Sequence, residues 1–396
     1  MGLLRARPAF RDLWLGRLVS FLGDSLGMVA LILYVAERAG TGTAVGLLLL
    51  AGDMVPAAAG PFVGALADRV RRRRLMVACE VLQGAVMLLI ALAEPPLVLL
   101  LALVGLRATL AAAFQPAARS AVPDLVGDDE LERANALLGF GTWGLDAVGP
   151  LIAAALLPFL DVRGLLVVDA VSFFLAVPFL LRLPALGPAP REEETRLRTD
   201  VLEGLRFVWS ERLVRVVVLG FAAVVLCTAI DDVALVFFAT DTLRAGETVA
   251  SLLYAGSGIG LLLGFLFLTR RASGGRARAL LLVGLAVASG GNALTGLSRV
   301  AAVALSMQVL RGLGIALVEV GHNVVLQREV PAHLRGRAFA NLYTALGLAA
   351  GLAYLLGGPL VDATSPATAL VVSGTLGVAA AGVMALRLRG TPATSR

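Results

Sequence analysis

The stretch Gly64-Ala65-Leu66-Ala67-Asp68-Arg69-Val70-Arg71-Arg72-Arg73-Arg74 decides the fold, because five of its last six residues are arginine. It lies between two apolar runs, at residues 43–67 and 75–93, and each run has the length of a membrane-spanning helix. Five guanidinium groups within six residues cannot remain in hydrocarbon, so the stretch predicts a cytoplasmic turn between two membrane helices. It therefore indicates both the class of the protein and its orientation in the membrane.

The composition is that of an integral membrane protein. Of the 396 residues, 58% are hydrophobic and 16% are charged, and the mean hydropathy is +0.87. A helix satisfies its own backbone hydrogen bonds in lipid, and about 20 apolar residues suffice to cross a bilayer. We predict an all-α integral membrane protein with twelve spans, at about 13–36, 43–67, 75–93, 97–118, 135–160, 164–183, 214–240, 248–269, 279–298, 300–325, 338–360 and 366–386.

The formal net charge is +6, and arginine supplies every basic side chain because the sequence contains no lysine. Most arginines fall on one side of the predicted spans, which places both termini in the cytoplasm. Membrane orientation explains the basic character, so we expect no nucleic-acid partner. The exclusive use of arginine suggests a GC-rich bacterial genome, and we expect a multi-pass protein of the bacterial cytoplasmic (inner) membrane.

The two halves of the chain echo each other. Arg107 in the fourth span corresponds to Arg311 in the tenth, and Gly149-Pro150 in the fifth corresponds to Gly358-Pro359 in the eleventh. Matching positions in a six-plus-six arrangement indicate an internal duplication, which is typical of transporters. We predict two six-helix bundles related by pseudo-two-fold symmetry, at residues 1–187 and 214–396, joined by a cytoplasmic linker with an amphipathic helix at residues 188–213.

Ionisable side chains inside the spans are the best candidates for the mechanism, because each costs about 2.5–3.5 kcal/mol at a helix centre. The strongest occupy spans one, four, seven and ten, and they are Asp24, Arg107, Asp231, Asp232, Arg311 and Glu319. For four other embedded acids, Asp53, Glu80, Asp146 and Asp169, we favour a structural role. Glu80 lies near the cytoplasmic end of its span, where it can snorkel or pair with the arginine turn.

We expect Asp24 to pair with Arg107, and either Asp231 or Asp232 to pair with Arg311. Separating such a pair changes the proton affinity of the carboxylate, which links protonation to conformation. The alternative for both pairs is static ion pairing that only holds helices together.

Several motifs resemble those of the major facilitator superfamily over nearly the whole chain. The stretch from Gly64 to Arg73 resembles its signature turn between helices two and three, with Arg71 in place of the usual glycine. Arg107 resembles the buried arginine of the fourth helix of drug–proton antiporters, and Gly149-Pro150 resembles the motif of their fifth helix. Leu334-Arg335-Gly336-Arg337 resembles a motif of the branch that contains macrolide, tetracycline and siderophore exporters.

The resemblance implies that spans one, four, seven and ten line a central cavity. It also implies a monomeric secondary transporter that works by alternating access, with a small amphipathic drug or metabolite as substrate and protons as the driving ions. We interpret Gly64, Asp68, Arg69 and Arg72 as a cytoplasmic gate, since Asp68 can pair with a neighbouring arginine only when the cavity is closed inward. Gly149-Pro150 is expected to bend span five.

Other functions remain open on the same fold, namely an importer or a lipid or lysolipid flippase. A membrane enzyme, an ATP-driven pump and a non-transporting scaffold are further classes. Without lysine the chain has no phosphate loop of the Gly-x-x-x-x-Gly-Lys type. Its two cysteines and two histidines lack metal-ligand spacing. We therefore expect no enzymatic activity, no metal and no cofactor, with the proton gradient as the energy source.

The gate hypothesis makes a specific prediction for Asp68. Replacing Asp68 by Asn should weaken transport with little change in membrane insertion, because the following arginines alone satisfy the orientation rule. The measurement is the transport rate divided by the amount of inserted protein in membrane vesicles. An unchanged rate per inserted molecule would contradict a gating role for Asp68.

Overall fold

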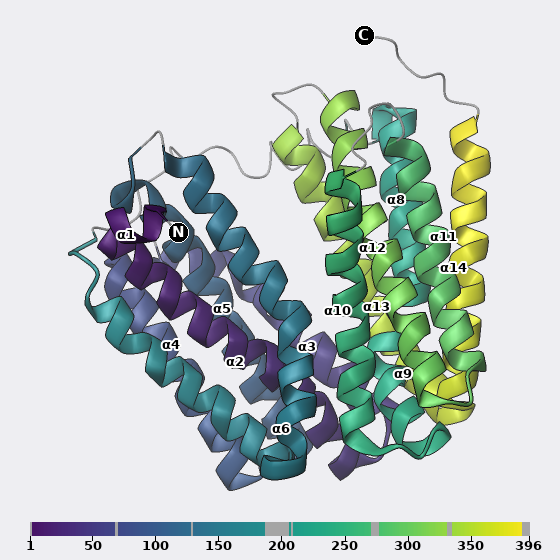
Figure 1. The fold of residues 1–396 in the computed structure, drawn as a ribbon, viewed down its shortest axis with the longest axis horizontal. Coiled ribbons are helices and arrows are strands. Elements are labelled where there is room, and N and C mark those ends of the chain that lie inside the picture. The colour runs from purple at the N-terminus through teal and green to yellow at the C-terminus, as the bar shows by residue number, and fades with distance from the viewer. Residues whose placement is uncertain are drawn as a thin grey trace. The chain divides into compact units, whose positions relative to one another are not determined.

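The computed structural model describes residues 2–67, 70–127, 130–186, 206, 209–270, 277–330 and 335–389. All regular elements in these ranges are helical (Figure 1). Eleven of the described helices are long and apolar enough to cross a membrane. One of them, α6 (Leu131–Leu181), leaves helical geometry at Asp161 and supplies both the fifth and the sixth predicted spans. The prediction of twelve spanning helices is therefore confirmed.

Contacts divide the chain into two compact units. Unit 1 comprises Met1–Gly40 and Leu47–Glu192, and unit 2 comprises Thr41–Gly46 and Glu193–Arg396. Residues 187–205 of the predicted linker region lie outside the described residues. The boundaries of the linker and its amphipathic helix therefore stay predictions.

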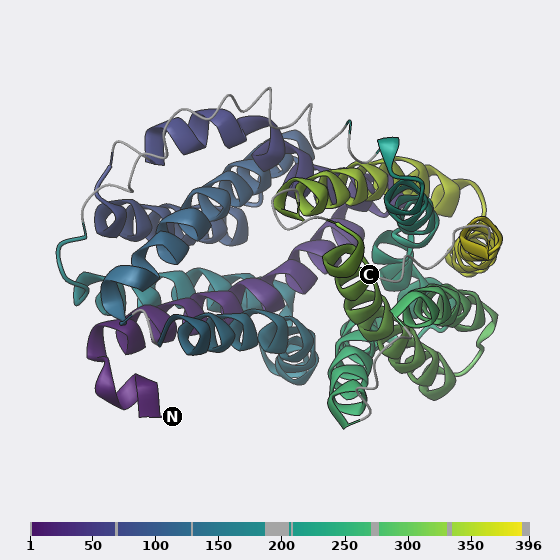
Figure 2. The same ribbon diagram turned by 90° about the horizontal axis from the view of Figure 1, so that it is seen from above.

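Unit 1 is built on two long helices that lie side by side, α2 and α6 (Figures 1 and 2). Small residues on α2 allow this close approach. A Cβ atom on Gly23 would clash with Ser172, and one on Gly27 would clash with Asp169. The helices of this unit are α1 (Gly2–Ala6), α2 (Pro8–Ala39), most of α3 (Gly42–Ala67), α4 (Arg72–Ala93), α5 (Leu97–Leu125) and α6.

Unit 2 also depends on glycine contacts between helices. A Cβ atom on Gly260 of α10 would clash with the backbone of α12 at Val309, and one on Gly284 of α11 would lie 2.7 Å from the carbonyl oxygen of Gly314. The elements of this unit are α8 (Arg212–Thr228), α9 (Asp231–Phe237), the π-helical turn η2 (Phe238–Thr242), α10 (Gly246–Arg270), α11 (Ala277–Leu297), α12 (Ala301–Glu329), α13 (Arg335–Ala363) and α14 (Pro366–Arg389).

The break between spans five and six is made by Asp161. Its backbone has φ 56° and ψ −177°, which interrupts the hydrogen-bond ladder of α6. Its Oδ1 atom accepts a hydrogen bond of 2.8 Å from the backbone N–H of Gly164, as a helix N-cap does. Asp161 therefore ends one span and begins the next.

The seventh predicted span corresponds to one candidate membrane span, Arg212–Thr242, whose helix is irregular at Ala229 and Ile230. We predicted one helix over residues 214–240, whereas α8 ends at Thr228 and α9 begins at Asp231. The backbone carbonyl of Thr228 accepts a hydrogen bond of 3.2 Å from Nδ2 of Asn292, which is fully buried. An interrupted helix in a membrane requires such a partner for each released backbone group. The interruption therefore places Asp231 and Asp232 at the first turn of α9.

The cap at Asp161 predicts the effect of two substitutions. Asp161→Ala removes the carboxylate that accepts from the N–H of Gly164, so it should cost about 1 kcal/mol of stability. Asp161→Asn should retain most of this stability, since the Asn side-chain oxygen can accept the same hydrogen bond from Gly164. Thermal unfolding in detergent measures both variants, and equal midpoints for wild type and Asp161→Ala would contradict the capping role.

Candidate functional site

Unit 1 contains an ion pair between two of the embedded charges. Arg107 of α5 pairs with Asp24 of α2. The Arg107 side chain is 8% exposed, whereas the Asp24 side chain is 31% exposed. A guanidinium so deeply buried needs a carboxylate partner, because an unpaired charge is strongly destabilising there. The pair thus joins the first and fourth spans, and its role in coupling stays a prediction.

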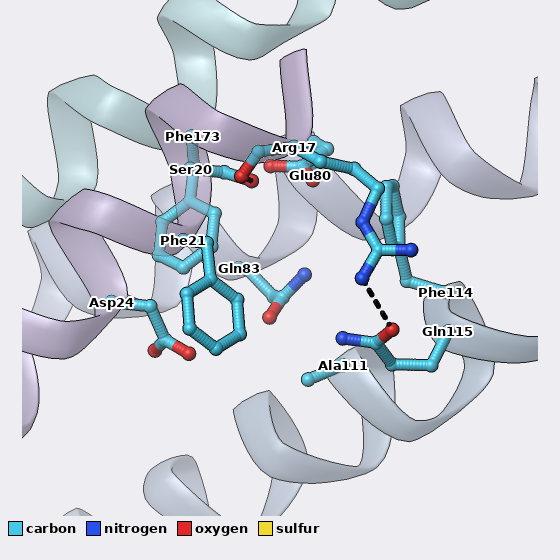
Figure 3. Close-up of a pocket in the computed structure, with 10 residues that line it drawn as sticks. All are labelled: Arg17, Ser20, Phe21, Asp24, Glu80, Gln83, Ala111, Phe114, Gln115 and Phe173. Atoms are coloured by element: carbon cyan, nitrogen blue, oxygen red, sulfur yellow. Dashed lines mark hydrogen bonds between the residues drawn. The ribbon is translucent and has the colours of Figure 1, made fainter. Parts of the chain in front are cut away.

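A small polar cavity of about 30 Å³ lies beside Asp24 within unit 1 (Figure 3). This volume suits about one water molecule. Figure 3 shows Arg17 directed at Gln115, and the Arg17 Nη2 atom donates a hydrogen bond of 2.9 Å to Gln115 Oε1. The polar side chains that line the cavity are Arg17, Ser20, Asp24, Glu80, Gln83 and Gln115.

Glu80 is not where the sequence led us to expect it. It is only 2% exposed, so it does not snorkel, and the groups that act on it are Ser20, Arg17 and Asp169 rather than the arginine turn. Sequence reasoning also missed Arg17, because it lies near the start of span one where arginines are expected at the membrane surface. Yet Arg17 is 8% exposed and belongs to the polar cavity.

Unit 2 contains the second ion pair. Of the two candidate acids, Asp231 and Asp232, the one within ion-pair distance of Arg311 is Asp231. The Arg311 Nη2 atom of α12 lies 2.6 Å from Oδ2 of Asp231, which is fully buried. The Nη1 atom of Arg311 donates a hydrogen bond of 2.6 Å to Oγ of Ser257 in α10. Asp231, at the helix interruption, is therefore the ion-pair partner of Arg311.

Arg311 also acts on Asp232 electrostatically, but the described hydrogen-bond partners of Asp232 are two tyrosines. Its Oδ2 atom accepts a hydrogen bond of 3.2 Å from the hydroxyl of Tyr354 in α13. Its backbone carbonyl accepts one of 2.8 Å from the hydroxyl of Tyr254 in α10. The two adjacent acids thus connect the interrupted seventh span to three neighbouring helices of unit 2.

Glu319 shares a helix with Arg311 but lies apart from it. Eight residues separate the two, which corresponds to about 12 Å along an α-helix. Glu319 is half-buried, His322 acts on it electrostatically, and Glu319 in turn acts on Tyr343. The six candidates from the sequence therefore form two ion-paired sites and one separate acid.

The proposed gate residues are only partly described. Asp68 and Arg69 lie outside the described residues, as does the side chain of Asp146, and Gly64 belongs to the backbone of α3. Arg72 forms an ion pair with Asp124 of α5 inside unit 1.

Gly149 and Pro150 lie inside α6, where Gly149 provides a close contact rather than a break. A Cβ atom on Gly149 would clash with Ser25 of α2. The break of α6 occurs at Asp161 instead. The expected bend of span five at this motif stays a prediction.

The buried pair of unit 2 predicts a compensating double substitution. Arg311→Gln should destabilise the protein by about 3–5 kcal/mol, because it leaves the buried Asp231 without its cation. The double variant Asp231→Asn with Arg311→Gln should recover part of this loss, and Arg299→Gln, an exposed arginine, serves as the control. Thermal unfolding in detergent measures all three. A double variant no more stable than Arg311→Gln would show that the pair is not the source of stability.

Comparison with known proteins agrees with this architecture. The multidrug efflux pump Tap of Mycobacterium bovis (strain BCG / Pasteur 1173P2) is 28% identical over 415 residues, covering 96% of this chain and 93% of that protein. The enterobactin exporter EntS of Shigella boydii is 28% identical over 392 residues, covering 95% and 92%.

Among solved structures, that of the nucleoside transporter NupG superposes with a TM-score of 0.79 at 13% identity, over 97% of this chain and 100% of that one, which indicates a shared fold. The sequence profile of the Major Facilitator Superfamily matches residues 13–238, more than half of the chain. The protein therefore belongs to the Major Facilitator Superfamily and is a multi-pass membrane transporter.

Proposed function

We propose that the protein is a secondary active exporter that exchanges protons for small amphipathic drugs or metabolites. The observation that supports this most is one acid–arginine ion pair in each unit, with one buried partner in each pair, at spans one and four and at spans seven and ten. Static packing does not require charge in these positions, since an apolar pair is as stable or more so. The relatives Tap and EntS are named as an efflux pump and an exporter, which favours outward transport.

The coupling in this proposal runs through Asp24 and Arg107. Asp24 is the more exposed partner and lines the polar cavity, so water can bring a proton to it. Protonation removes the negative charge of Asp24 and with it the attraction to Arg107. A conformation that separates α2 from α5 then becomes less costly, and the reverse change expels the proton. Protonation and conformation are thus two ends of one equilibrium.

The energy of a proton gradient is sufficient for this exchange. One charge that crosses 100 mV releases about 2.3 kcal/mol. Since about 1.4 kcal/mol corresponds to a tenfold ratio, one proton can maintain a substrate gradient of roughly forty-fold. No cofactor is needed in this scheme.

The charge distribution of unit 1 favours a cytoplasmic location of both termini in a bacterial inner membrane. Arg38 and Arg163 belong to the few arginines at the predicted outer ends of the spans. Both pair with Glu94, Arg38 through a contact of 3.1 Å, so their charge is partly compensated. The remaining excess of arginine lies toward the other face, as expected for cytoplasmic ends. We propose a monomer with the gate at Gly64, Asp68, Arg69 and Arg72 on that side.

Transport into inverted membrane vesicles tests the proposal. With an imposed pH gradient, a labelled macrolide or another labelled amphipathic drug from a test panel should accumulate in vesicles with the protein, and an uncoupler should abolish this. Accumulation that requires ATP hydrolysis, or movement only in the opposite direction, would reject the proposal in favour of a pump or an importer. Movement of labelled lipid alone would favour a flippase.

The same assay gives a prediction for Asp24. Asp24→Asn removes the titratable group but retains its size, so accumulation driven by the pH gradient should fall to the level of vesicles without the protein. The matched control is Asp241→Asn, an exposed acid in η2, which should transport normally. The amount of each variant in the membrane is determined by immunoblot. Normal accumulation by Asp24→Asn would exclude Asp24 as a coupling group.

A further inference from the structure

An acid that the ion pairs do not use lies deep inside unit 1. Asp169 of α6 is fully buried, and neither of its carboxylate oxygens has a hydrogen-bond partner among the described residues. A buried polar group without a partner is rare in folded proteins, and an ionised one is strongly unfavourable. A residue kept only for packing at this place would not need a carboxyl group. The carboxyl group of Asp169 therefore calls for a function.

The neighbouring helix provides a fitted space for this carboxyl group. A Cβ atom on Gly27 of α2 would clash with the carboxylate of Asp169, and one on Gly23 would lie 3.1 Å from its Oδ1 atom. Gly23 and Gly27 are one helical turn apart, so they present one continuous face. The backbone of α2 thus forms a pocket, the Gly23–Gly27 socket, that admits a carboxyl group without offering a hydrogen bond to either oxygen.

The charges that face Asp169 leave one negative charge without compensation. Arg107 of α5 acts electrostatically on Asp169, and it also pairs with Asp24 of α2. Two carboxylates therefore share one guanidinium. Glu80 of α4 and Asp169 also act on each other electrostatically, and so do Glu80 and Arg17 of α2. Asp24, Glu80 and Asp169 together with Arg107 and Arg17 carry one net negative charge, which one bound proton neutralises. Arg119, which also acts on Arg17, is exposed.

We propose that Asp169 carries the transported proton in unit 1, and that Arg107 alternates between Asp24 and Asp169. When Arg107 pairs with Asp24, as in this structure, Asp169 is a neutral carboxylic acid in the Gly23–Gly27 socket. When Asp24 takes up a proton from water, Arg107 turns to Asp169. The O–H bond of Asp169 then breaks, its proton leaves to water, and the guanidinium compensates the new carboxylate, so one proton enters at Asp24 for each one released at Asp169. The Nε atom of Arg107, which has no partner among the described residues, is available for that second contact. This inference rests on the proposed proton coupling.

Three measurements on Asp169→Asn test the inference. Asn has the size of Asp and fits the socket, so exchange of labelled for unlabelled drug across vesicles without a pH gradient should persist. Accumulation driven by a pH gradient should be lost, and so should the release of protons when the drug is added to purified protein in weak buffer. The control is Ser172→Ala, which removes a hydroxyl that donates to the backbone carbonyl of Asp169 and keeps the acid, and it should retain all three activities.

The outcomes separate this inference from the proposed function. If wild-type protein shows no proton-driven accumulation, the proposed function itself is wrong. If wild type is proton-driven and Asp169→Asn is equally so, only the role of Asp169 is wrong. If a normally inserted Asp169→Asn variant loses both exchange and accumulation, Asp169 has a structural role, and this outcome would also overturn the inference.

A second variant tests the inference if Asp169→Asn does not insert. Gly27→Ala adds a methyl group against the carboxyl group and should shift the pH at which transport is half-maximal. Gly16→Ala is the matched control, because Gly16 lies on the same helix, faces Ala176 and Phe179, and has room for a Cβ atom at 3.4 Å. An unshifted pH profile in Gly27→Ala would contradict the inference.

Discussion

The cost of charge in hydrocarbon is the constraint on which the rest of this structure depends. A buried charge must find a partner inside the protein, because neither lipid nor the helix backbone can supply one. Arg107 and Arg311 meet this requirement with Asp24 and Asp231, once in each unit. An ion pair that forms in one conformation and separates in another stabilises the first relative to the second, and protonation can change that balance. Transport by this protein follows, in our account, from that property.

Close helix packing makes the charged sites possible. Glycines on α2 bring α6 near enough to place Asp169 beside the helix backbone, within range of Arg107. In unit 2 the interruption between α8 and α9 positions Asp231 toward Arg311, and Asn292 satisfies the backbone carbonyl that the interruption releases. In unit 1, glycines that lack a side chain make room for Asp169. In unit 2, the irregular helix between α8 and α9 makes room for Asp231.

The sequence predicts the spans well because the length of an apolar run and the position of arginines are local properties. The hydrogen-bond partners of buried side chains are not a local property. Asp232 and Tyr354 lie 122 residues apart, and their spacing in the sequence does not predict their hydrogen bond. The buried faces of Arg17 and Glu80 were missed because a charge near the end of a span is equally compatible with the membrane surface. The interruption at Thr228 carries no proline or glycine signal, and its stabilisation comes from Asn292 on another helix.

The most direct test of the central claim is to measure proton movement that a substrate gradient drives in proteoliposomes. Purified protein is reconstituted with a pH-sensitive dye inside, no pH gradient is imposed, and a transported drug is added on one side. Our account predicts that protons move opposite to the drug, at a rate that scales with the amount of protein. Drug movement with no accompanying change in internal pH would contradict it.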